Sequence, residues 1–70
     1  MSKHDIINDI ADTLECIVRD VEVLQEITVY LADCGQCDDP TAALCRMKDL
    51  VIDVQKLSAS VFTAANTLLP

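Results

Sequence analysis

The stretch Asp33-Cys34-Gly35-Gln36-Cys37-Asp38-Asp39-Pro40-Thr41 divides the chain into two long segments with helical periodicity. It contains the single glycine of the sequence and the only proline inside the chain. Glycine commonly takes the left-handed conformation that ends a helix, and Asp39-Pro40 is typical of an N-cap followed by the first helical residue. The sequence therefore predicts a turn over about 34–39, between a helix over about 5–33 and a helix over about 40–67.

Both flanking segments carry apolar residues at the spacing of a heptad repeat. The predicted core row of the first helix is Ile7, Ile10, Leu14, Ile17, Val21, Leu24, Thr28 and Leu31. The predicted core row of the second helix is Met47, Leu50, Val54, Leu57, Val61, Ala64 and Leu68. The predicted fold class is therefore all-α, an antiparallel two-helix hairpin whose helices are each roughly 40 Å long.

Further apolar residues recur every seven positions outside these rows. They are Cys16, Val23 and Tyr30, with Ile6 and Ile27 beside them, in the first helix, and Cys45, Ile52 and Ala59, with Phe62 beside them, in the second. One interpretation is a broad apolar arc within a single core. The interpretation that we favour is a second interface, because exposed large apolar residues in register are costly for a monomer. The candidate interaction residues are Cys16, Val23, Ile27, Tyr30, Ile52 and Phe62.

Four cysteines in 70 residues raise the question of a disulfide or a metal site. Cys16 lies about 27 Å from Cys34 along a continuous helix, far beyond the Cα separation of about 7 Å that a disulfide allows. Cys34, Cys37 and Cys45 can approach one another around the turn, where three thiolates and a further ligand could hold zinc. A single Cys-x-x-Cys is a weak signal, so we expect a metal-free, reduced turn. Redox catalysis is not expected, because the C-terminal end of a helix disfavours a thiolate.

The formal net charge of −7 and five scattered basic residues disfavour direct binding to nucleic acid. The only histidine, His4, lies at the opposite end of its helix from the turn cysteines, so no catalytic set can be assembled around it. We expect no enzymatic activity and no cofactor. The most apolar long window, residues 50–69, is interrupted by charged residues, so no membrane span is expected. No signal peptide is recognised, which predicts a cytoplasmic location.

These observations predict a non-enzymatic protein–protein interaction module that acts through apolar helix faces, such as a small regulator, an adaptor or a chaperone-like binder. We expect a homodimer that forms a four-helix bundle, or a hairpin that binds another protein. Two alternatives remain open. The regularly spaced carboxylates between Asp5 and Glu26 could mimic nucleic acid and block a basic groove, and the turn cysteines could make a metal-binding hairpin.

Overall fold

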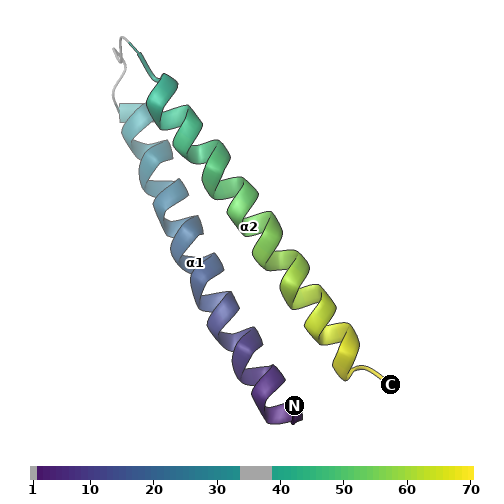
Figure 1. Ribbon diagram of the computed structural model, residues 1–70. Helices are drawn as coiled ribbons and strands as arrows, with labels where there is room; N and C mark the ends of the chain where they lie inside the picture. The colour runs from purple at the N-terminus through teal and green to yellow at the C-terminus, as the bar shows by residue number, and fades with distance from the viewer. Residues whose placement is uncertain (1, 34–38) are drawn as a thin grey trace.

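The computed structural model describes residues 2–33 and 39–70. These residues form two helices, α1 (Lys3–Asp33) and α2 (Thr41–Leu68), which lie side by side and run in opposite directions (Figure 1). The two termini lie at the same end of the molecule (Figure 1). The described part of the chain contains no strand. The predicted all-helical hairpin is confirmed, and the observed helix bounds differ from the predicted ones by at most two residues.

Each helix begins at a side chain that accepts a hydrogen bond from the first turn. The hydroxyl oxygen of Ser2 accepts a bond from the backbone N–H of Asp5 at 3.2 Å. The carboxylate of Asp39 accepts one from the backbone N–H of Thr41 at 3.0 Å. The N-cap position itself is occupied by Pro40, one residue later than predicted, so Asp39 caps the helix from the position before it. The predicted roles of Gly35 and of the rest of the turn over 34–38 lie outside the described residues.

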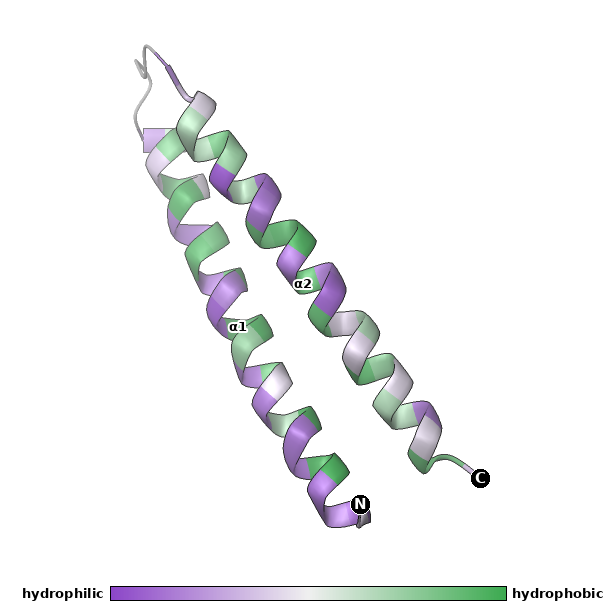
Figure 2. Ribbon diagram, viewed as in Figure 1, coloured by the Kyte–Doolittle hydropathy of each residue, from purple (hydrophilic) through white to green (hydrophobic). Residues whose placement is uncertain are grey.

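The two helices meet along a seam of half-buried residues whose spacing alternates between three and four. On α1 the seam consists of Ile6, Ile10, Thr13, Ile17, Asp20, Leu24, Ile27 and Leu31. On α2 it consists of Ala43, Met47, Leu50, Val54, Leu57, Val61, Ala64 and Leu68. This alternation is the heptad spacing of helices that pack nearly in line. Apolar and polar residues alternate within the turns of both helices (Figure 2).

The seam confirms the predicted core row of α2 and corrects that of α1. Four of the eight predicted positions on α1 lie in the seam. The other four, Ile7, Leu14, Val21 and Thr28, are exposed, and the residues directly before them take their places. Two of the replacements, Thr13 and Asp20, are polar. The prediction was wrong at these positions because it assigned the most apolar row of α1 to the contact with α2.

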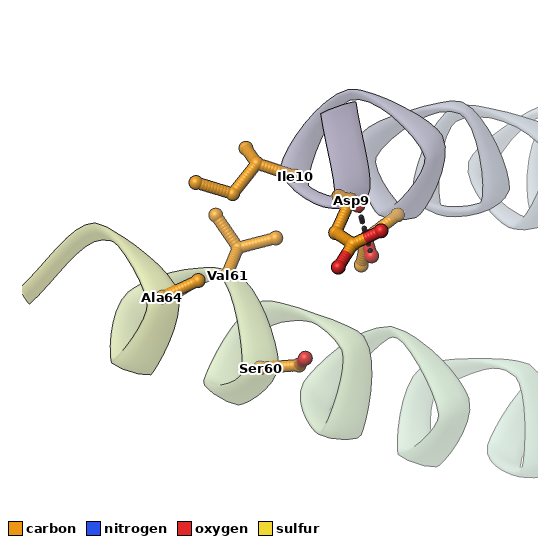
Figure 3. A pocket seen from close by; sticks show the side chains of 6 residues that line it. Asp9, Ile10, Ser60, Val61 and Ala64 are labelled. Atoms are coloured by element: carbon orange, nitrogen blue, oxygen red, sulfur yellow. Dashed lines mark hydrogen bonds between the residues drawn. The ribbon is translucent and has the colours of Figure 1, made fainter. Parts of the chain in front are cut away.

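Contacts across the seam fix the register of the two helices. Near the chain termini, a small hollow is lined by Asp9, Ile10 and Thr13 of α1 and by Ser60, Val61 and Ala64 of α2, with Ile10 and Val61 pointing toward each other (Figure 3). Nearer the middle of the hairpin, Asp20 meets Asp53. Residues of α1 and α2 that lie at the same level therefore pair in opposite order: a later residue of α1 lies level with an earlier residue of α2.

The single hairpin does not enclose a core. None of its described residues is fully buried. Its accessible surface is 5404 Å², about 1100 Å² more than the roughly 4300 Å² typical of a globular protein of this mass. The radius of gyration is 16.2 Å, against about 11 Å for a compact domain of this length. The hairpin is a rod, and each helix contacts only one neighbour.

The Asp39 cap generates a first prediction. Its hydrogen bonds with Thr41 lower the pKa of Asp39, so its stabilising effect is present above the ordinary carboxyl range and is lost as the pH falls through the lowered pKa. We expect Asp39→Ala to lower the melting temperature by several degrees at pH 7 and to have little effect at pH 2, as measured by circular dichroism. Asp49→Ala, an exposed change inside α2, is the control. An equal effect of Asp39→Ala at both pH values would contradict the cap.

Candidate interaction surface

Most of the large apolar residues that the seam leaves exposed lie on one side of the hairpin. Ile7, Leu14 and Val21 remain 51%, 46% and 38% exposed, respectively. On α2, Val51 and Phe62 are also exposed, Phe62 by 70%. Each of these residues directly follows a seam residue in the sequence, so helical geometry rotates it by about 100° from its seam neighbour. Because α1 and α2 run antiparallel, this rotation carries both sets to the same side.

We call this side the apolar face. It consists of Ile7, Ala11, Leu14, Val18, Val21, Gln25 and Thr28 of α1 and of Leu44, Lys48, Val51, Gln55, Ser58, Phe62 and Ala65 of α2. Lys48 is its only charged residue. All of these residues are exposed except Ala65, which is half-buried. The apolar face spans both helices and covers most of the length of the hairpin.

The opposite side is formed by the residues that directly precede each seam residue, and we call it the charged face. Its charged side chains are Asp5, Asp9, Asp12, Arg19, Glu26, Arg46, Asp49, Asp53 and Lys56. The contrast between nine charged residues here and one on the apolar face makes the whole hairpin amphipathic. A solvated face and an apolar face therefore divide the surface along the length of the molecule.

The predicted interaction residues are not gathered on one surface. Cys16 and Tyr30 are exposed, and Val23 is half-buried, on the side of the charged face. Ile27 lies in the seam between the helices. The remaining two residues are exposed on α2, where Phe62 belongs to the apolar face and Ile52 lies on the side that points away from α1.

The apolar face was missed because the sequence contains two adjacent apolar rows on α1. Ile6 and Ile7 are equally apolar, and so the choice between the rows depends on the polar residues Thr13 and Asp20. The sequence did contain a signal for this face. On α1, Ala11 and Val18 follow Ile7 and Leu14 by four residues, so they widen the apolar row of Ile7, Leu14 and Val21 on the side away from the seam. An arc of this width exceeds what one neighbouring helix can cover.

The two polar seam residues are accommodated differently. The hydroxyl of Thr13 donates a hydrogen bond of 2.8 Å to the backbone carbonyl of Asp9 on its own helix. Asp20 shares a hydrogen bond with the carboxyl group of Asp53, while its Oδ2 atom is shielded from solvent without a hydrogen-bond partner in the described structure. This hydrogen bond, burial and the charge of Asp53 raise the pKa of Asp20, and the nearby Arg19 acts in the opposite direction.

The candidate metal ligands cannot be assembled from the described residues. Cys34 and Cys37 lie outside them. Cys45 is exposed on the side of α2 that points away from α1. Within residues 2–33 and 39–70, no three His, Cys, Asp or Glu side chains lie close enough together to hold a metal ion. Neither helix is long and apolar enough to cross a membrane over the residues described.

Comparison with known proteins gives no relative for this chain: no family model, no curated protein and no solved structure matches it. The candidate surface therefore rests on the physical properties of its own residues.

Asp20 generates a second prediction. Because its pKa is raised in the folded state, the folded chain binds this proton more tightly than the unfolded chain, whose carboxyl has the ordinary value of 3.8. The contribution of Asp20 to stability is therefore greatest at acidic pH and falls as the pH rises through the raised pKa. We expect Asp20→Asn to raise the melting temperature at pH 7 and to change it little at pH 3. Asp12→Asn on the charged face is the control. A lower melting temperature for Asp20→Asn at pH 7 would contradict the unfavourable carboxyl pair.

Proposed function

We propose that the protein is a non-enzymatic protein–protein interaction module that binds through its apolar face. The observation that supports this proposal is the concentration of exposed apolar side chains on one side of both helices. An uncovered apolar area of this extent is rare on monomeric soluble proteins and marks a protein interaction site. Binding a helical partner would cover the face and enclose the half-buried seam beneath it.

A second copy of the chain is the partner that we propose first. The hairpin exposes about 1100 Å² more surface than a globular protein of its mass. A stable interface buries about 800 Å² on each partner, so the excess is of the size that self-association requires. Two hairpins packed through their apolar faces form a four-helix bundle, in which the charged faces stay outside and in water.

The orientation of the apolar residues on α1 supports this assembly. In a four-helix bundle each helix contacts two neighbours, so its apolar arc is wider than the contact with one partner. On α1 the seam lies at one edge of such an arc, and the row Ile7, Leu14 and Val21 continues the arc away from α2. The binding activity that we propose is that of a small regulator, an adaptor or a chaperone-like binder built on this bundle.

Self-association generates a third prediction. Gel filtration with light scattering should give about twice the chain mass of 7.7 kDa at micromolar concentration. Leu14→Glu and Val51→Glu should each weaken the dimer at least tenfold, because each places an unpaired charge inside the interface. Thr63→Glu adds the same charge to α2 on the side of the charged face and should leave the dimer unchanged. A helical, cooperatively melting monomer at these concentrations would contradict self-association.

A further inference from the structure

We infer that the two copies pack with equivalent helix ends together, so that α1 of each copy contacts α2 of the other. This inference rests on the self-association proposed above. It adds the orientation of the two copies and the residues that select that orientation. It follows from the different charges along the outer edges of the two helices and from the register of the hairpin.

Two twofold arrangements can bring the apolar faces together. With the twofold axis parallel to the helices, equivalent ends coincide, and α1 lies over α2 of the second copy. With the axis across the helices at their midpoints, close to Val18 and Gln55, opposite ends coincide, so that α1 lies over α1 and α2 over α2. Both arrangements give antiparallel neighbours, and therefore the backbone alone does not choose between them. The side chains at the edges of the apolar face make the choice.

The outer edge of α1 is acidic, whereas that of α2 contains no acid. Beside the apolar face, α1 presents Glu15 and Glu22, both exposed. The corresponding edge of α2 presents Cys45, Ile52 and Ala59. An α1-over-α1 arrangement would bring Glu15 of each copy to the level of Glu22 of the other. This arrangement is unfavourable, because it places like charges at the edge of the interface. An α1-over-α2 arrangement places both glutamates against an uncharged edge.

The register adds complementary pairs to this second arrangement. A twofold axis parallel to the helices leaves every residue at its own height, so that residues level within one hairpin are also level between copies. The hollow that Thr13 and Ser60 both line and the pairing of Asp20 with Asp53 set these heights. By the same register, the large side chain of Phe62 lies level with the small side chain of Ala11, and Lys48 lies level with Gln25.

Lys48, the one charged residue of the apolar face, finds an acid only in this arrangement. Glu22 lies within one helical turn of Gln25, at the level of Lys48 from the second copy. A shallow, open depression on α1 is lined by Glu22, Gln25, Glu26 and Val29 among the described residues. The aliphatic stem of a lysine can cover such a surface while its ammonium group reaches the carboxylate. In the other arrangement Lys48 lies level with Phe62 of the second copy.

Cross-linking between two singly labelled copies tests the orientation. In a background with all four cysteines changed to serine, one copy carries Val18→Cys and the other Gln55→Cys, two positions that are level in the hairpin. We expect a short thiol cross-linker to join the mixed pair and to leave each variant alone uncross-linked. The opposite orientation predicts the reverse, because Val18 would then face Val18 and Gln55 would face Gln55. That result would overturn our inference.

A charge exchange gives a second measurement. We expect Lys48→Glu to weaken the dimer about five- to tenfold at low salt, and Glu22→Lys in the same chain to restore most of the affinity. Lys56→Glu, the same charge change on the charged face, is the matched control. A dimer that is insensitive to Lys48→Glu would overturn the proposed pairing while leaving self-association intact. The absence of any dimer from the unchanged chain would instead contradict the proposed function itself.

Discussion

The constraint on which this structure depends is that two helices side by side cannot enclose anything. Each helix covers one stripe of its neighbour and leaves the rest of its circumference in water. Even the best-packed residues of the seam are therefore only half-buried. A chain with 51% hydrophobic residues has more apolar surface than one such contact can cover. Most of the excess large apolar side chains lie on one face of the hairpin.

The position of α1 relative to α2 follows from this excess. If α1 turned its most apolar row toward α2, Ile7, Leu14 and Val21 would gain partial cover. Its remaining surface would then carry no second row of comparable strength. The observed position places Thr13 and Asp20 in the seam. The raised pKa of Asp20 shows that this position is unfavourable for its charged carboxylate. The polar seam residues and the exposed apolar row are thus two consequences of one rotation of the helix.

The sequence alone was sufficient for the elements and insufficient for this rotation. Asp39-Pro40 predicted the start of α2 to within one residue. The unbroken row from Met47 to Leu68 predicted its half-buried seam, because only one apolar row competes there. On α1, the rows beginning at Ile6 and Ile7 share four of their eight residues. The first contains two polar residues and the second one, so heptad counting favoured the wrong row. The apolar face therefore became visible only when the exposure of each side chain was known. Of the predicted interaction residues, Phe62 alone belongs to it.

The division of charge between the two sides also limits how far assembly can proceed. Each chain carries a formal charge of −7, and all but one of the charged residues that the structure describes lie off the apolar face. When two apolar faces meet, the surface left exposed is acidic over both hairpins, and a third hairpin would meet like charge wherever it approached. The apolar residues would favour the binding of a second hairpin, and the carboxylates would oppose the binding of a third. In the proposed dimer, the same sequence pattern would thus promote pairing and favour a closed assembly over an open one.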